Sequence, residues 1–362
     1  MNKSRIKYLD IARGLAMMMV IAGHIIQPEI LGNTLRYYLF AVHLPLFLII
    51  SGILFKEKNY KNLLTKNISK LILPYLIGVL LTILMFIIEY YQPWSSFLHY
   101  VVVKNLNSVS QTVLASILVN GGDYYAFLPQ FGVKIGAIWY LVAYFEASFL
   151  FNAIIKFVRS RISQIIIIIA LTGLGYGIGI YTALPFQILS ALVMLPFLGA
   201  GYYTKKYWLD ASQCNLKIDV GLSIIGVILW VLSAQKGILL LVSAEATQGP
   251  ILGTVAGIMG SFALLIWIRK LENITWFKFF IPLSIQIGQV SLMMLVVHTL
   301  DLNVFPLSAW TMKVLHIFIH SEALVNYIAM FTAIIYAFIG AIILQFIFDK
   351  TEAYIKNNLK FI

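Results

Sequence analysis

One arginine and one histidine are spaced so that a helix would carry both on the same face. Arg13 and His24 are eleven residues apart in a mostly apolar stretch. At 3.6 residues per turn, eleven residues make about three turns and about 16 Å of rise. Asp10 precedes Arg13 by one turn, which places the two charges side by side. Because an imidazole titrates near neutral pH, this stripe predicts proton-transfer chemistry with His24 as general base.

Two more histidines fall in apolar runs, where ionisable groups are costly and indicate function. His43 lies in the second run, just before Pro45, at a depth similar to that of His24. His298 lies in the ninth run and would end a helical stripe of mostly small or polar residues, Ser284, Gly288, Ser291 and Leu295. Either histidine could orient His24 or relay its proton. Helix packing alone is the alternative reason for the small residues.

Glu146 is the most deeply placed acid in the chain, and a buried acid needs a partner. It is seven residues after Trp139, so a helix would place both on one stripe. Glu146 or Asp10 could hold a basic partner in the site. The plainer interpretation is that Asp10 and Arg13 form an ion pair that sets topology, and that His24 is a buried histidine with satisfied hydrogen bonds.

The composition predicts the elements that position these residues. Of 362 residues, 61% are hydrophobic and 11% are charged, against about 25% charged in soluble domains. The apolar runs are long and continuous, which excludes a barrel and favours an all-α polytopic membrane protein, organised as a single domain over 1–362. We expect ten membrane-spanning helices, at 9–27, 37–55, 71–90, 136–155, 162–181, 184–204, 219–241, 249–268, 281–301 and 323–348.

The positive charge predicts the orientation of these helices. The net charge is +12, and basic residues gather in alternate loops. Cytoplasmic loops carry the excess of lysine and arginine, so we expect both termini in the cytoplasm and the charge to serve topology rather than nucleic-acid binding. The inner loop 56–70 holds five lysines. That cluster suits either a polyanionic ligand or ordinary loop charge.

Metal and disulfide chemistry are not expected. Cys214 is the single cysteine, which leaves no internal disulfide and no cysteine-pair metal site. His316 and His320 have metal-ligand spacing, but no third ligand is evident. The first apolar run lacks a small-residue cleavage site, so we expect a retained first helix and no cleaved signal.

Several motifs together resemble the membrane-bound acyltransferase-3 family. The pattern Leu9-Asp10-Ile11-Ala12-Arg13-Gly14 with His24 is similar to the opening of that family. Further segments match it in order over about residues 5 to 348. They are Leu44-Pro45-Leu46-Phe47 with Ser51-Gly52, Leu73-Pro74-Tyr75, Trp139-Tyr140-Leu141, Leu195-Pro196-Phe197 with Gly199, and Ile287-Gly288 with Ser291 and His298.

The resemblance implies an O-acetyltransferase of the bacterial plasma membrane. Such enzymes take an acetyl or other acyl group from cytoplasmic acyl-CoA and pass it to a hydroxyl, often of a surface polysaccharide or its lipid-linked precursor. The family's catalytic arginine and histidine correspond to Arg13 and His24. Its second basic motif, two arginines three apart, is matched only by Asn67 and Lys70, with Lys66 adjacent, and these lysines would bind CoA phosphates as point charges.

We also expect Trp139, Ser51 and Tyr124 to contact the acceptor, with Tyr124 in the long outer loop 91–135. The chain resembles the form of the family without an additional extracytoplasmic domain. Two other functions fit the buried polar residues. One is a transporter or flippase with a proton relay, and the other is a membrane sensor whose histidines report pH.

Overall fold

The computed structural model confirms an all-α polytopic membrane protein. It describes residues 6–27, 33–91, 107–121, 134–210, 215–272, 274, 277–303 and 306–358. Within these ranges, nine helices are long and apolar enough to cross a membrane, and a bent helix pair would make a tenth. The cytoplasmic location of both termini stays a prediction.

The chain runs through the following elements in order. They are α1 (Lys7–Ile25), α3 (Asn33–Ile53), α4 (Tyr60–Asn67), the π-helix η1 (Ile68–Ile72), α5 (Leu73–Tyr91), α7 (Asn107–Leu118), η2 (Gly136–Ile138), α8 (Trp139–Phe157), α9 (Arg161–Gly179), η3 (Pro185–Gln187), α10 (Ile188–Leu209), α11 (Leu216–Lys236), β1 (Leu239–Leu240), β2 (Glu245–Ala246), α12 (Pro250–Leu271), η5 (Phe277–Phe279), α13 (Ile281–Gln289), α14 (Ser291–Asn303), α15 (Leu307–Leu315) and α16 (Glu322–Asn358).

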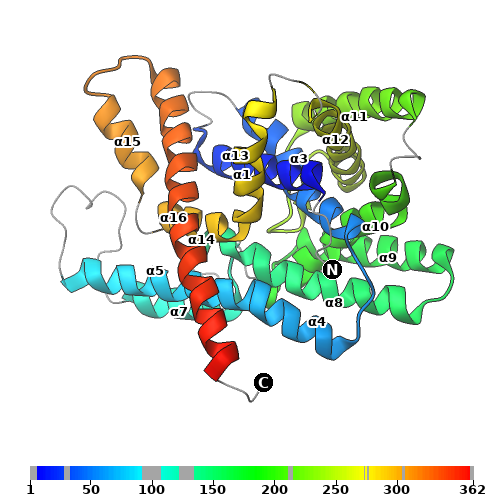
Figure 1. Ribbon diagram of the computed structural model, residues 1–362, viewed down its shortest axis with the longest axis horizontal. Helices are drawn as coiled ribbons and strands as arrows, with labels where there is room; N and C mark the ends of the chain where they lie inside the picture. The colour runs from blue at the N-terminus through cyan, green and yellow to red at the C-terminus, as the bar shows by residue number, and fades with distance from the viewer. Residues whose placement is uncertain are drawn as a thin grey trace.

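Helix α1, which carries Arg13 and His24, is the most enclosed of the long helices. Within its apolar window 78% of residues are buried, against 17% for α11. It packs against α3, α12, α13, α14 and α16. Figure 1 shows α1 in the middle of the bundle, with α13 against it. A polar face on this helix therefore points at protein rather than at lipid.

Glycines bring α1 and α13 into backbone contact. A Cβ on Gly288 would collide with the backbone carbonyl of Asp10, and one on Gly14 would collide with that of Ser284. A second pair, Gly52 and Gly201, does the same between α3 and α10. Small residues at such crossings allow the close approach on which helix packing in membranes depends. Close packing thus accounts for Gly288 and Gly52.

The predicted inner loop 56–70 is wrong over most of its length. From residue 60 the chain is helical, and α4 continues through the π-helix η1 into α5. Leu63 and Asn67 lie one turn apart and are both buried, and the Asn67 side chain donates to Ser148 Oγ at 2.6 Å. The sequence analysis missed this amphipathic helix because six charged residues among fifteen lower the hydropathy on which the loop assignment depended.

The predicted span 281–301 is also wrong as one straight helix. The chain breaks at Val290, and α13 and α14 meet at an angle of 74°. The stripe from Ser284 to His298 therefore does not continue along one helix. The hydroxyl of Ser291 donates to the Gly288 carbonyl at 3.0 Å and so takes up an acceptor that the break leaves open.

The predicted span 219–241 ends earlier than expected. Helix α11 stops at Lys236, and the apolar residues that follow form a two-stranded antiparallel hairpin, in which Leu239 pairs with Ala246 and Leu240 with Glu245. Thr247 Oγ1 accepts from the Ile238 amide at 2.8 Å and closes the base of the hairpin. Hydropathy alone cannot separate a buried apolar strand from the end of a helix.

The α1–α13 contact should tolerate no side chain at Gly288. Gly288→Ala places a methyl group against the Asp10 carbonyl, and overpacking of this kind costs about 1–3 kcal/mol. We expect a lower Tm for detergent-purified protein in thermal unfolding. Gly177→Ala is the matched control, since open space surrounds that position on α9, and it should leave the Tm unchanged or slightly raised. An equal Tm for both variants would contradict the tight contact.

Candidate active site

His24 lines two adjoining cavities of different size. The smaller, of about 50 Å³, is mostly apolar, and His43 and Tyr140 also line it. The larger, of about 540 Å³, is lined by more polar residues, among them Arg36 and Asn303. The side chain of His24 is accessible from this space. The smaller cavity has room for a few atoms only, whereas the larger is in the range of small-ligand sites.

Three histidines lie close together, and two of them, His24 and His43, line the smaller cavity. The ring centroids of His24 and His298 are 5.5 Å apart, and Phe40 lies between His24 and His43, at 5.4 Å and 4.8 Å from their rings. His43 Nδ1 lies 2.9 Å from the carbonyl of Leu39. Because a carbonyl only accepts, Nδ1 carries the proton, and the neutral ring presents Nε2 as an acceptor.

His298 is buried without a hydrogen-bond partner. Its side chain is 1% exposed, and neither ring nitrogen finds a donor or acceptor among the described residues. Buried polar groups are nearly always hydrogen-bonded, so water or a ligand is expected at this ring. The structure brings His298 next to His24, although the straight helix expected over 281–301 is broken, and the role of His298 stays a prediction.

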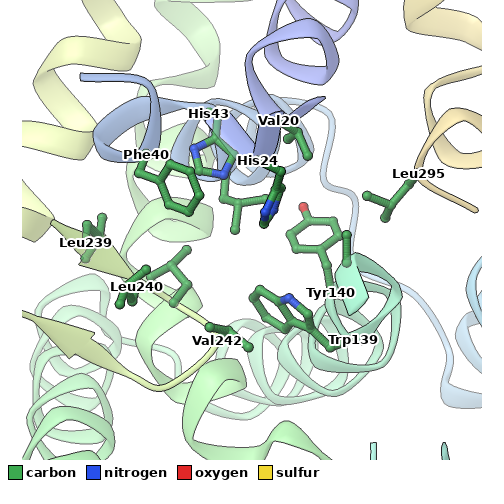
Figure 2. Close-up of a pocket in the computed structure, with 13 residues that line it drawn as sticks. Val20, His24, Phe40, His43, Trp139, Tyr140, Leu239, Leu240, Val242 and Leu295 are labelled. Carbon is green, nitrogen blue, oxygen red and sulfur yellow. The ribbon is translucent and has the colours of Figure 1, made fainter. Parts of the chain in front are cut away.

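Tyr140 is a residue that the sequence-based assignment of the site did not include. Its ring lines the smaller cavity, and Figure 2 shows its hydroxyl pointing toward His24. The residue is 7% exposed, and in the described ranges no hydrogen-bond partner of the hydroxyl is found. Its ring stacks on Tyr144 at 6.0 Å, nearly parallel. The i, i+4 spacing of these tyrosines beside Trp139 was the available signal.

Arg13 lies near this tyrosine pair. Its Nη1 is 3.0 Å from Oδ1 of Asp10, which is buried. The predicted pairing of Asp10 with a basic partner is therefore present. Arg13 is close enough to Tyr140 and Tyr144 for its charge to act on both phenols. Arg13 lines neither cavity, whereas Tyr140 lines the smaller one together with His24, so Tyr140 is near both residues.

The structure brings the two predicted lysines to Arg13. Lys66 is close enough to Lys58, Lys70 and Arg13 for their charges to interact. Lys66 and Lys70 are exposed at the surface. We call Arg13, Lys58, Lys66 and Lys70 the basic cluster. Four cations at one place repel one another unless an anion is bound, and their density suits a ligand with several phosphates.

Of the remaining predicted site residues, the structure brings Trp139 to the cavities and leaves Ser51 and Glu146 outside them. Trp139 lines both cavities. Ser51 lines neither cavity and donates to the Phe47 carbonyl at 2.9 Å. Glu146 is half-buried, lines neither cavity, and makes no ion pair within the described ranges. Tyr124 lies outside the described residues. The roles predicted for all four stay predictions.

Metal ligands do not gather in the described part of the chain. No group of three or more His, Cys, Asp or Glu side chains there has a metal-binding arrangement. His316 instead lies 3.3 Å from the carboxylate of Glu322.

The fold and the site define a multi-pass membrane protein that has histidines at internal cavities and a cluster of basic side chains near the tyrosine that lines one of them. A family model described as an acyltransferase domain, Acyl_transf_3, matches residues 6–347, nearly the whole chain. The chain therefore belongs to the acyltransferase-3 family and is a membrane acyltransferase. No curated protein and no solved structure matches it.

Cysteine labelling should show that the larger cavity opens away from the cytoplasm. In a Cys214→Ser background, Ser243→Cys places a thiol in the wall of that cavity, and Thr65→Cys places one beside the exposed Lys66. A membrane-impermeant maleimide added to intact cells should label position 243 alone, and position 65 only after the membrane is opened. Met17→Cys, at a buried position on α1, should resist both. Labelling of position 65 in intact cells would contradict the predicted orientation.

Proposed function

We propose that this chain is an O-acetyltransferase that moves an acetyl group from cytoplasmic acetyl-CoA to a hydroxyl of a saccharide. The acceptor is a cell-surface polysaccharide or its lipid-linked precursor, and the membrane is the plasma membrane of a bacterium. Family membership supports acyl transfer. The single observation that carries the proposal is the position of His24, which lines two cavities, while Arg13 of the basic cluster is close to Tyr140 in the wall of the smaller one.

The basic cluster is the proposed site for the phosphates of CoA. Arg13 can offer a planar fork to one phosphate, while Lys58, Lys66 and Lys70 act as point charges. Asp10 holds the Arg13 side chain through the 3.0 Å ion pair. Arg13 and His24 are eleven residues apart on one continuous helix, about 16 Å along its axis. The long pantetheine arm of CoA suits that separation, with the thioester toward the histidines.

His24 is the proposed general base. It takes the proton of the acceptor hydroxyl as the hydroxyl oxygen attacks the thioester carbonyl carbon. The new carbon–oxygen bond gives a tetrahedral oxyanion, and the hydroxyl of Tyr140 donates a hydrogen bond to it. The carbon–sulfur bond then breaks, and the sulfur of CoA receives the proton that His24 holds. The ester remains on the acceptor.

His298 and His43 are positioning residues in this scheme. His298 lies against His24 at 5.5 Å between ring centroids, and its unpartnered nitrogens can share a water with that ring. His43 is held by its bond to the Leu39 carbonyl. In the larger cavity, Trp139 supplies an aromatic wall, and a volume of about 540 Å³ accommodates one or two sugar rings.

Substitutions at His24 and in the basic cluster should have separable kinetic effects. His24→Gln removes the base, and we expect acetyl transfer to fall about 10²- to 10⁴-fold with unchanged binding of acetyl-CoA. Lys66→Gln combined with Lys70→Gln should instead weaken acetyl-CoA binding, more strongly at low salt. Lys217→Gln, an exposed lysine of α11 outside the cluster, is the matched control. Transfer and donor binding are measured on purified protein.

Retention of full transfer by His24→Gln would overturn the proposed chemistry. Unchanged acetyl-CoA binding in the double lysine variant would remove the basic cluster from the donor site. Mass spectrometry of surface glycans from cells with and without the protein identifies the acceptor, because its loss should remove one acetyl group from a particular sugar.

A further inference from the structure

An arginine lies in the larger cavity beside the proposed base. Arg36, on α3, lines that cavity together with His24. Its guanidinium carbon is 5.1 Å from the centroid of the Phe40 ring, and the same ring is 5.4 Å from that of His24. Arg36 is also close enough to His24 for their charges to interact. A group bound by Arg36 is therefore held next to the reacting hydroxyl.

Arg36 has no anionic partner in the part of the chain that is described. Its Nε is buried and makes no hydrogen bond, and the side chain forms no ion pair there. Glu245 lines the same cavity, but its carboxylate accepts a hydrogen bond from Ser243 at 3.2 Å and does not pair with Arg36. Arg36 is partly buried, and a buried N–H group without an acceptor is costly, so this guanidinium can bind an anion that arrives with a ligand.

A second donor in the cavity also lacks an acceptor. Asn303, at the end of α14, lines the cavity, and its Nδ2 is buried without a hydrogen-bond partner. An amide nitrogen and a guanidinium both donate only. Lys134 lines the same space, so the cavity holds two cations and one carboxylate. The unpaired N–H groups of Arg36 and Asn303 can therefore donate hydrogen bonds to acceptor oxygen atoms of a bound ligand.

We propose that the acceptor is an acidic saccharide, whose carboxylate or phosphate group is bound by Arg36 next to the hydroxyl that is acylated. This inference rests on the proposed function and narrows its acceptor class. An arginine binds both kinds of anion through paired N–H donors.

The first test identifies the natural product. Glycans from cells with and without the protein are compared by mass spectrometry and NMR, and the sugar that loses its acetyl group is located. We expect a carboxylate or phosphate on that sugar or on its direct neighbour. A neutral sugar with neutral neighbours would overturn this inference and leave the O-acetyltransferase proposal intact. The absence of any lost acetyl group would instead count against the proposed function.

The second test assigns the anion to Arg36. With the isolated acceptor, Arg36→Gln should raise the KM for acceptor about 10- to 100-fold, the range expected for a lost charged hydrogen bond, while acetyl-CoA binding is unchanged. Arg36→Lys should restore part of the affinity. Lys236→Gln, an exposed lysine that lines neither cavity, is the control and should match the unmodified protein.

Neutralising the acceptor distinguishes the two anions. Reduction of its carboxylates to alcohols, or removal of its phosphates with hydrofluoric acid, should raise the KM of the unmodified protein and leave that of Arg36→Gln unchanged. The treatment that has this effect identifies the anion. If Arg36→Gln loses affinity equally for native and neutralised acceptor, or loses none for either, Arg36 does not bind the anion and the inference fails.

Discussion

Ionisable side chains at membrane depth require protein, water or a ligand around them, and this requirement shapes the structure. Helix α1 carries Asp10, Arg13 and His24, and it is the most enclosed of the long helices. Its backbone contact with α13, through Gly14 and Gly288, keeps lipid away from these groups. Asp10 compensates the charge of Arg13, while His24 faces the two cavities. The polar face of α1 thereby lies inside the protein, where it forms part of the candidate site.

The tyrosine pair lies near both parts of that interior. Tyr140 and Tyr144 stack on each other, both are close to Arg13 of the basic cluster, and Tyr140 lines the smaller cavity with His24. Under the proposed function this arrangement separates a charged donor on one side from a sugar on the other and leaves the 50 Å³ pocket for the acyl group alone. Exclusion of bulk water from a space of that size favours transfer to the acceptor over hydrolysis of the thioester. Under the further inference, Arg36 would hold an acidic acceptor in the larger cavity, next to His24.

The order and approximate positions of the membrane-spanning helices were predictable, because hydropathy and helical periodicity reflect burial directly. Nearly all spans and the shared helix of Arg13 and His24 follow from those two signals. The break at Val290 did not follow, since no proline or charge marks it and the local packing of α13 against α1 decides it. The hairpin after Lys236 was not predicted for a similar reason, because its first strand, Leu239–Leu240, is as apolar as a membrane helix.

The membership of the site was predictable only in part. His24, His43 and His298 stood out because histidine is rare in apolar runs, and their clustering is confirmed. Tyr140 and Arg36 did not stand out. Tyrosine is common at membrane interfaces. Arg36 was counted among the basic residues of the loops, without a role in the site. What distinguishes them is an unpartnered hydroxyl that points toward His24 from the wall of the smaller cavity and an unpartnered Nε on a side chain that lines the larger one, and those features depend on helices far apart in sequence.

The most direct test of acyl transfer across this interior uses sealed membrane vesicles of known orientation. Radiolabelled acetyl-CoA is supplied only on the cytoplasmic side, and the acceptor glycan identified in cells is supplied only on the other side. We predict labelled ester on the glycan with the unmodified protein and none with His24→Gln. Label that forms only when donor and acceptor share one side would contradict a path from the basic cluster past Tyr140 to His24.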